Sequence, residues 1–434
     1  MFPFDLQLFA TGGGVVTNTT GNYVNSYTGD TTSFSGANTL SAEMKTYYDT
    51  ELLENARPEM VHAQFAKKQA IPKGRGKTIE WRKFNTLANA SQLTEGVIPS
   101  GQKLGVSNLT DTVDQYGTYV SVSDMLELTA IDPVILEAQT ELSASAGRTQ
   151  DELVRNDLMT GTSVIYAQKL SGSPAALTDV TSRIGLDATA KLTPDTVNRA
   201  ATFLKKMKAP TINGEYVAII HPSVAYDLRS SDEWLDVHKY CRPEEIYQGE
   251  IGKLHGVRFI ETTQAKIFNG ADLASNSRTL ATNSSGAISS GTSITFDGGT
   301  VAEHALKGRK ILIGSVVYTV SDNTASSGTA TITTVETIST SIANDSVIYP
   351  GEGASSGLAC YATLFLGKEA FGVVDVAGGG LQMIVHDKHS AGGPLDQFST
   401  IGYKLTSNGA KILYQDRMVR VESCSAYSSV DSGN

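Results

Sequence analysis

The chain has 434 residues, 40% of them hydrophobic, which is enough for two or three hydrophobic cores. Its formal net charge of −10 disfavours general nucleic-acid binding, which needs many Lys and Arg side chains to replace phosphate counterions. A bilayer-spanning helix needs roughly 20 consecutive apolar residues, and the sequence has no such stretch, while Cys241, Cys360 and Cys424 stand too far apart to predict a disulfide framework or a cysteine zinc site.

The N-terminal part of the chain is predicted to be an arm followed by a helix. Met1–Ala10 has no basic region and contains Asp5, so we expect no secretory signal. Thr11–Asn38 is rich in Thr, Gly, Asn and Ser and is too polar to bury a core of its own. We predict that this arm lies across neighbouring subunits, with attachment to its own subunit as the alternative. Ser41–Lys68 has apolar residues at helical spacing, and Pro58 should interrupt that helix.

A long projecting loop is predicted next. Thr78–Phe84 is typical of a strand, and Gln115–Val122 is predicted as its antiparallel return. About 30 mostly polar residues separate them, and a stretch of that length without periodicity is usually functional or projects from the body. Basic residues gather near its base, and we weigh a contact with a neighbouring subunit equally with a merely solvated surface, and DNA contact below both. They are Lys67, Lys68, Lys73, Arg75, Lys77, Arg82 and Lys83.

A long helix is predicted from Asp132–Pro133 to Thr160. Asp132 suits the N-cap, and Pro133 suits the first helical position. One apolar stripe runs along the segment, formed by Ile135, Ala138, Leu142, Ala146, Leu153 and Leu158. With a rise of 1.5 Å per residue, the helix should be about 40 Å long before Gly161 ends it.

From Thr193 the pattern is that of an α/β unit. Helices are predicted at Thr193–Met207 and from His221–Pro222 to Arg229, with the buried strand Tyr216–Ile220 between them. Further strands are predicted at Gly256–Glu261 and Tyr361–Leu366.

A segment of different composition interrupts this unit. Ala271–Gly357 is rich in Ser, Thr, Gly and Ala, and it contains short β-type runs at Ser293–Phe296, Lys310–Val320, Thr329–Val335 and Ser346–Tyr349. Short strands with Ser/Gly turns predict a small all-β domain inserted into the α/β unit. We expect it to face solvent, because insertions are tolerated at exposed loop tips.

Strands return after Gly378–Gly380. They are predicted at Leu381–His386, Thr400–Leu405, Ala410–Tyr414 and Met418–Glu422. We expect them to pair beside the long helix, so that the two ends of the chain complete one domain.

Two segments resemble catalytic or nucleotide-binding motifs and are rejected. Lys73–Thr78 looks like a phosphate-binding loop, but Ile71 stands where the pattern requires Gly, and the segment leads into a strand. Gly353–Gly357 matches the nucleophile elbow around Ser355, yet it lacks the strand before it and the helix after it.

Metal binding is also disfavoured. His386 and His389 are the only closely spaced histidines, and no third ligand accompanies them. We therefore predict that the protein is not an enzyme and has no catalytic, cofactor-binding or metal-binding residues.

Several segments, taken in order, resemble one protein family. They are Glu80–Phe84, Leu93–Pro99, Tyr116–Gly117, Ser123–Asp124, His221–Leu228, Gly249–Ile260, Gly392–Gln397 and Met418–Glu422. Their order and spacing resemble the major capsid proteins of the N4-like family of tailed phages. The resemblance covers most of Glu43–Ser425, and the N-terminal arm and the β insert depart from it.

The resemblance implies the α+β Hong Kong 97-type capsid fold, with the small all-β domain as an insert. Carried over to this sequence, it implies an N-terminal arm at 1–77, an extended loop at 78–122, a peripheral domain with its long spine helix at 123–192, the first part of an axial domain at 193–270, the β insert at 271–357, the axial return at 358–380, and the peripheral strands with the C-terminus at 381–434.

The same resemblance implies a major capsid protein. Its chains should assemble in the bacterial host cytoplasm into hexamers and pentamers of an icosahedral virion head around double-stranded DNA. The implied partners are copies of itself, a portal, decoration or cement proteins, and a separate scaffolding protein, since the sequence starts without a long charged helical leader. No membrane or cofactor is implied. An encapsulin-type nanocompartment shell is the alternative, and a surface adhesin or binding module ranks below it.

Overall fold

The computed structural model describes most of the chain from Met60 onward. The described residues are 60–71, 76–84, 87, 89–90, 92, 101–123, 134–172, 176–231, 252–284, 287–326, 328–376, 381–386 and 397–434. They belong to two compact units. The first comprises Met1–Gln64, Lys68–Val154 and Gly372–Lys411, and the second comprises Phe65–Lys67, Arg155–Phe371 and Ile412–Asn434.

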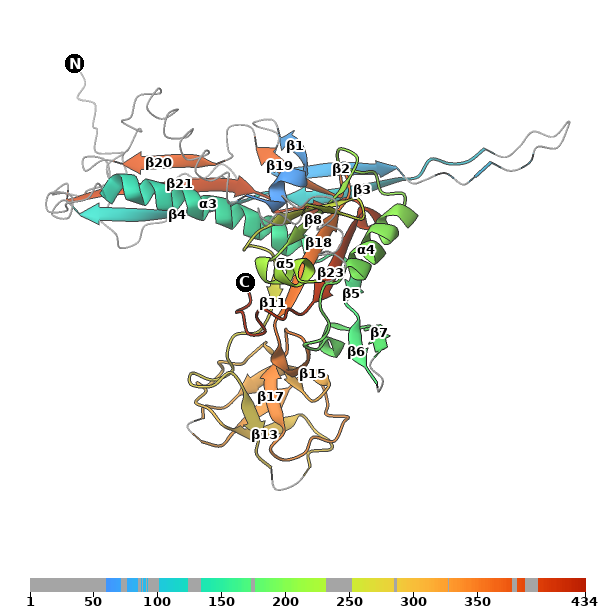
Figure 1. The fold of residues 1–434 in the computed structure, drawn as a ribbon. Coiled ribbons are helices and arrows are strands. Elements are labelled where there is room, and N and C mark those ends of the chain that lie inside the picture. The colour runs from blue at the N-terminus through green and yellow to red at the C-terminus, as the bar shows by residue number, and fades with distance from the viewer. Residues whose placement is uncertain are drawn as a thin grey trace, which may run out of the picture. The chain divides into compact units, whose positions relative to one another are not determined.

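A three-stranded antiparallel sheet carries the core of the first unit (Figure 1). In order, its strands are β20 (Gln382–His386), β21 (Phe398–Ser407) and β4 (Asp114–Ser123). Two of the four predicted C-terminal strands, Leu381–His386 and Thr400–Leu405, are thereby confirmed. Their pairing with a strand that comes before the long helix joins distant parts of the chain in one sheet.

Helix α3 (Val134–Leu158) lies along one face of this sheet (Figure 1). Its buried Leu142 and Ala146 pack against Ile401 and Leu405 of β21 and against Met383 of β20. The long helix is therefore confirmed, although its predicted cap, Asp132–Pro133, lies outside the described residues. The predicted apolar stripe of this helix was wrong near its C-terminal end, because Val154 is fully buried there and Leu153 is only half-buried.

A two-stranded ribbon forms the next part of the first unit. β2 (Thr78–Phe84) matches its prediction, and it pairs antiparallel with β3 (Val106–Thr112) from Thr78↔Thr112 to Phe84↔Val106. Gln115–Val122 is a strand as predicted, within β4, but its predicted pairing with Thr78–Phe84 was wrong, because β4 pairs with β21. The true return strand has the sequence VSNLTDT, which has no apolar alternation, so nothing in its side chains signals a strand.

Residues 60–71 correct the predicted helix Ser41–Lys68. A short 3₁₀ helix, η3 (His62–Phe65), is followed by strand β1 (Lys67–Ile71). β1, β19 (Phe371–Val376) and β22 (Lys411–Ile412) form a three-stranded sheet, in which backbone pairing outweighs the weak helical pattern. The rest of that predicted helix and the arm Thr11–Asn38 lie outside the described residues.

The second unit contains a mixed sheet of seven strands. Six of them follow the order β5 (Val164–Tyr166), β23 (Met418–Ser423), β18 (Cys360–Leu366), β8 (Tyr216–Ile220), β10 (Val257–Glu261) and β9 (Lys253–Leu254), and β11 (Ile267–Phe268) pairs with β18. The predicted strands at Tyr216–Ile220, Gly256–Glu261 and Tyr361–Leu366 are confirmed. β8 is buried at every position, as its unbroken apolar sequence predicts.

Two helices of this unit begin as predicted. α4 (Pro194–Lys206) has Thr193 as its N-cap, and the Thr193 hydroxyl accepts a hydrogen bond from Thr196 N at 3.3 Å. α5 (Pro222–Arg229) is capped by His221, whose Nδ1 accepts from Ser223 N at 3.2 Å. Proline at the first helical position suits both starts, since its missing N–H would have had no helical partner.

Strand β23 corrects the prediction for Met418–Glu422. It pairs antiparallel with β18 and parallel with β5, so it lies in the mixed sheet and not beside the long helix. All six of its residues are buried, which is typical of a central strand. Its position near the end of the chain, after the other returning strands, suggested the long helix as its neighbour, and that prediction was wrong.

The predicted all-β insert forms a closed barrel within the second unit (Figure 1). Its strands follow the order β12 (Leu280–Thr282), β13 (Ser293–Asp297), β16 (Ala330–Thr334), β15 (Val316–Asn323), β14 (Lys310–Ile313) and β17 (Val347–Pro350). Phe296, Tyr318 and Ile332 belong to its own buried core. The predicted run Lys310–Val320 is a hairpin that turns at Gly314, where φ is 62°.

Short elements complete the second unit. They are β6 (Lys169–Ser171), β7 (Ala176–Thr178) and the 3₁₀ turns η4 (Arg183–Gly185), η5 (Ser355–Gly357) and η7 (Gln415–Arg417).

Candidate assembly surfaces

The β2–β3 ribbon is held at its base by Trp81. Ile79 and Trp81 are buried while Glu80 and Arg82 are exposed, which is the alternation of a strand with one covered face. The Trp81 ring lies directly on Gly372 of β19, where a Cβ atom would be 3.0 Å from the ring. Glycine therefore lets the indole approach the backbone closely and fixes the ribbon against the first unit.

Asn408 provides a second attachment of the ribbon. Its side chain accepts a hydrogen bond from Val374 N at 2.9 Å and donates one to Asp111 Oδ2 at 2.7 Å. Val113 N also donates to Lys77 O at 3.0 Å across the ribbon base. The sequence analysis missed Asn408, and the only available signal was its Asn-Gly dipeptide, which marks a turn.

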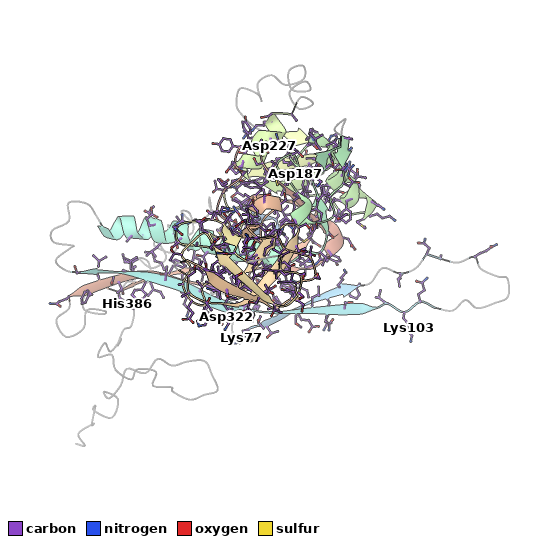
Figure 2. All side chains as sticks on the ribbon, turned by 90° about the horizontal axis from the view of Figure 1, so that it is seen from below. Lys77, Lys103, Asp187, Asp227, Asp322 and His386 are labelled. Carbon is purple, nitrogen blue, oxygen red and sulfur yellow. The ribbon has the colours of Figure 1, made fainter. Side chains whose placement is uncertain are left out.

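The other end of the ribbon exposes apolar side chains. Figure 2 shows Lys77 near the base and Lys103 toward the far end. There the cross-strand pair Phe84 and Val106 is 58% and 48% exposed, and Leu104 is 58% exposed. Soluble monomers seldom expose large apolar side chains in a group, and such groups usually mark an interaction surface. We name Phe84, Leu104 and Val106 the ribbon tip.

Two of the basic residues near the ribbon make exposed ion pairs. Lys67 Nζ lies 3.6 Å from Glu369 Oε2, and Arg82 Nε lies 3.8 Å from Glu80 Oε1. Pairs this exposed contribute little to stability. Lys73 and Arg75 lie outside the described residues.

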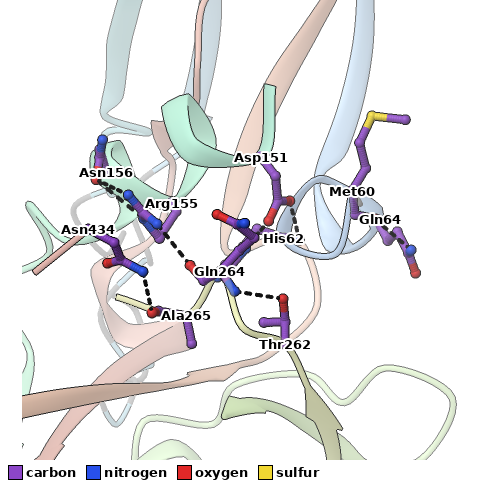
Figure 3. Close-up of polar contacts among 10 residues, drawn as sticks. All are labelled: Met60, His62, Gln64, Asp151, Arg155, Asn156, Thr262, Gln264, Ala265 and Asn434. Carbon is purple, nitrogen blue, oxygen red and sulfur yellow. Dashed lines mark hydrogen bonds and ion pairs between the residues drawn. The ribbon is translucent and has the colours of Figure 1, made fainter. Parts of the chain in front are cut away.

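His62 joins η3 to the long helix through a buried contact (Figure 3). Asp151 of α3 accepts a hydrogen bond from His62 N at 2.7 Å, and its other oxygen lies 2.6 Å from His62 Nδ1. Both side chains are almost completely buried, at 1% and 0% exposure. A carboxylate that binds both the backbone and the ring of one residue fixes the position of that residue on the helix.

The sheet face opposite α3 carries a shallow hollow of about 330 Å³. Tyr119 of β4 stands at this hollow, 72% exposed and directly across from Gly402 of β21. A Cβ atom at Gly402 would lie 2.7 Å from the Tyr119 Cβ, so the glycine makes room for the tyrosine. His386, from the predicted pair of histidines, lines the same hollow, and His389 lies outside the described residues.

A buried ion cluster braces the mixed sheet of the second unit. Arg183 donates two hydrogen bonds to the fully buried Glu422 carboxylate, both at 2.7 Å, and Arg420 Nε donates a third at 2.8 Å. The Arg183 guanidinium also stacks 3.5 Å from the ring centroid of Phe268. Burial raises the pKa of the neighbouring Cys360 thiol, which keeps it protonated and unreactive.

Two arginines bind the segments where the chain enters and leaves the barrel. Arg278 donates to the Gly357 carbonyl at 2.8 Å and to the Asn269 side chain. Arg309 donates to the carbonyls of Asp272 and Ala271 at 2.9 and 2.5 Å. The chain segments that enter and leave the insert are thus held by side-chain hydrogen bonds as well as by the chain connection.

The nucleophile-elbow and phosphate-loop motifs rejected from the sequence also lack the structure that these motifs require. Ser355 starts the short turn η5, whereas a nucleophile elbow lies between a strand and an α-helix. The described part of Lys73–Thr78 leads into strand β2 and not into a helix. Among the described residues, no group of three or more His, Cys, Asp or Glu could hold a metal ion, and no helix is long and apolar enough to cross a membrane.

Several solved structures that are similar to this chain are phage capsids. The capsid of cyanophage P-SCSP1u has 13% sequence identity and a TM-score of 0.51, over 85% of this chain and 89% of that one. The capsid of cyanophage Pam1 has 12% identity and a TM-score of 0.49, over 90% and 96%. The capsid of Ralstonia phage GP4 has 12% identity and a TM-score of 0.48, over 85% and 88%. The similarity to the P-SCSP1u capsid supports the predicted capsid fold.

Sequence comparison gives the family. No curated protein matches the chain. The phage capsid protein family matches residues 152–391, more than half of the chain, and this range includes most of the mixed sheet and the whole β barrel. The fold is the Hong Kong 97-type capsid fold, and the chain belongs to the phage capsid protein family.

Proposed function

We propose that this chain forms the hexamers and pentamers of an icosahedral tailed-phage head that encloses double-stranded DNA. As a capsid protein it is a structural component of the virion and assembles with copies of itself. The family membership favours this shell over an encapsulin-type nanocompartment. The order of the segments from Glu80–Phe84 to Met418–Glu422 supports placing it in the N4-like group.

The exposed ribbon tip is the observation that carries the proposal. Three large apolar side chains are exposed at the far end of the described ribbon, while its base is fixed by Trp81 and Asn408. In a shell, the tip of each ribbon would be buried against a neighbouring copy. Each such contact is modest, and closed symmetry repeats it many times.

The domain assignment follows the Hong Kong 97-type arrangement with one change. We assign 1–77 to the N-terminal arm, 78–122 to the extended loop, 123–192 to the peripheral domain, 193–270 and 358–380 to the axial domain, and 271–357 to the β insert. Strands β20 and β21 then complete the peripheral domain, whereas β23 belongs to the axial sheet because it pairs with β18.

Other partners follow from the same proposal. Assembly would take place in the host cytoplasm with a separate scaffolding protein and a portal, and decoration or cement proteins would bind the finished shell. The chain's net charge of −10 is compatible with a wall that does not adhere to the packaged DNA. The β barrel, with its own core, would be displayed on the outer face.

A double substitution, Phe84→Ser with Leu104→Ser, tests the ribbon-tip contact. We expect the variant to fold, because both side chains are exposed, and to form far fewer shells when expressed with the other head genes. The matched control is Val335→Ser in the β barrel, which is 64% exposed and should assemble like the parent. Sedimentation separates shells from free subunits, and equal shell yields for the two variants would contradict the proposal.

A further inference from the structure

The C-terminal segment 425–434 lies against an open edge of the mixed sheet. Strand β11 pairs with β18 through Ile267↔Tyr361, and Ala362 N donates to Lys266 O at 2.9 Å. Because backbone groups alternate in direction along a strand, those of Ala265 and Ile267 point away from β18. An edge of this kind is a template on which another chain can pair.

The side chain of Asn434 occupies that edge. Its Oδ1 accepts a hydrogen bond from Ile267 N at 2.9 Å, and its Nδ2 donates one to Ala265 O at 3.1 Å. A side-chain amide carries one acceptor and one donor side, as a peptide group does. Asn434 therefore bonds Ala265 and Ile267 in the pattern that one residue of an added parallel strand would make.

Gly433 brings the segment into close contact with the next part of the edge. A Cβ atom at this position would overlap the carbonyl oxygen of Asn269, so only glycine fits without a shift of the backbone. Asn269 Nδ2 also donates to Asp431 O at 2.5 Å. The edge from Ala265 to Asn269 is thus covered by residues 431–434.

Asp431 holds the segment in place through polar contacts. Its carboxylate accepts from Tyr361 Oη at 2.6 Å, from Ser223 Oγ at 3.3 Å and from Ser428 Oγ. The large apolar side chains of the segment, Tyr427 and Val430, are 70% and 67% exposed and do not fasten it to a core. Polar contacts, and not apolar packing, therefore hold residues 431–434 on the edge.

We propose that residues 431–434 are a cover, which keeps an extended segment of a second copy of this chain from pairing with β11 before the shell forms. The proposal rests on the proposed function, since a self-assembling shell protein must reach high local concentration while its edges stay blocked. It assigns to this polar C-terminal segment a protective role that is separate from any contact within the finished shell.

Two variants of the full chain remove the cover in different ways. Gly433→Ala pushes the segment from the edge by overlap with Asn269, and Asn434→Ala removes only the amide that pairs with Ile267 and Ala265. Ser432→Ala is the matched control, because Ser432 is exposed and lies next to Gly433 in the same segment. Circular dichroism checks that all three fold like the parent.

The test uses the free chain without other phage proteins, so it does not depend on whether shells form. In both variants we expect amide exchange in the peptide covering 265–269 to be faster by about tenfold or more. We also expect thioflavin-binding aggregates to appear several times faster than with Ser432→Ala, because uncovered edges pair. Unchanged exchange, or faster exchange with unchanged aggregation, would overturn the proposal. If Gly433→Ala folds poorly, Asn434→Ala alone decides.

Discussion

Single residues in this protein carry charges that the fold has to neutralise. Glu422 is fully buried, and it is tolerated because Arg183 and Arg420 supply three hydrogen bonds to its carboxylate. Asp151 is equally buried and binds His62 through both oxygens. These contacts position strands and helices, and the same residue types in the sequence could have been read as candidates for catalysis.

His304 gives the β barrel a pH dependence. It lies 2.6 Å from Asp322, and the hydrogen bond between them raises the pKa of His304 above 6.5 and lowers the pKa of Asp322 below 3.8. The contribution of charged His304 is complete below 6.5 and is lost as the pH rises through its raised pKa. The contribution of Asp322 is complete above 3.8 and is lost as the pH falls through its lowered pKa. The pair therefore stabilises most between 3.8 and 6.5.

We predict that His304→Gln reduces the difference in unfolding temperature between about pH 5.5 and about pH 9. The effect should be small, since both side chains are about half exposed and water screens the pair. Calorimetry of the parent and the variant at the two pH values measures it. A variant that keeps the full difference would show that the pair does not contribute.

At the scale of the element, the sequence predicts best where side-chain chemistry sets the structure. Helix α4 and helix α5 begin at their capping residues, and β8 has an unbroken apolar sequence. The prediction failed for β3, whose polar sequence is held by backbone pairing, and for β23, whose neighbour depends on the whole topology. No local pattern specifies such a partner.

The assembly surfaces likewise include features that the local sequence predicts and features that depend on strand pairing. Strand β2 was predictable from its sequence, but the apolar ribbon tip was not. Phe84 and Val106 become neighbours only through the register of β2 and β3, which the sequence pattern missed. Likewise Asn408 meets Asp111 across 297 positions of sequence.

The ribbon base provides an element-scale prediction. Gly372→Ala should press the added methyl group onto the Trp81 ring and destabilise the protein by about 1–3 kcal/mol. It should also lower the yield of shells, because the ribbon would leave its orientation. Gly328→Ala is the control, since no atom lies within 4 Å of a Cβ there, and its effect should stay within about 0.5 kcal/mol. Denaturant unfolding and shell yield are the measurements, and equal results for the two variants would contradict this account of the ribbon.

The whole molecule combines a capsid-type scaffold with exposed apolar surfaces. The mixed sheet and the β barrel have separate buried cores, while the ribbon tip and the Tyr119 face are exposed. In the residues described, the buried carboxylates of Glu422 and Asp151 are paired with arginine and histidine side chains, and no group of three or more His, Cys, Asp or Glu could hold a metal ion. These properties suit a chain that gains its final stability from assembly.

Electron microscopy of particles made by this chain together with the other head genes tests the central claim most directly. The account predicts closed icosahedral shells, in which Phe84, Leu104 and Val106 of each copy are buried against a neighbouring copy. A chain that remains monomeric under every condition, or shells in which the ribbon tip stays exposed to solvent, would contradict it.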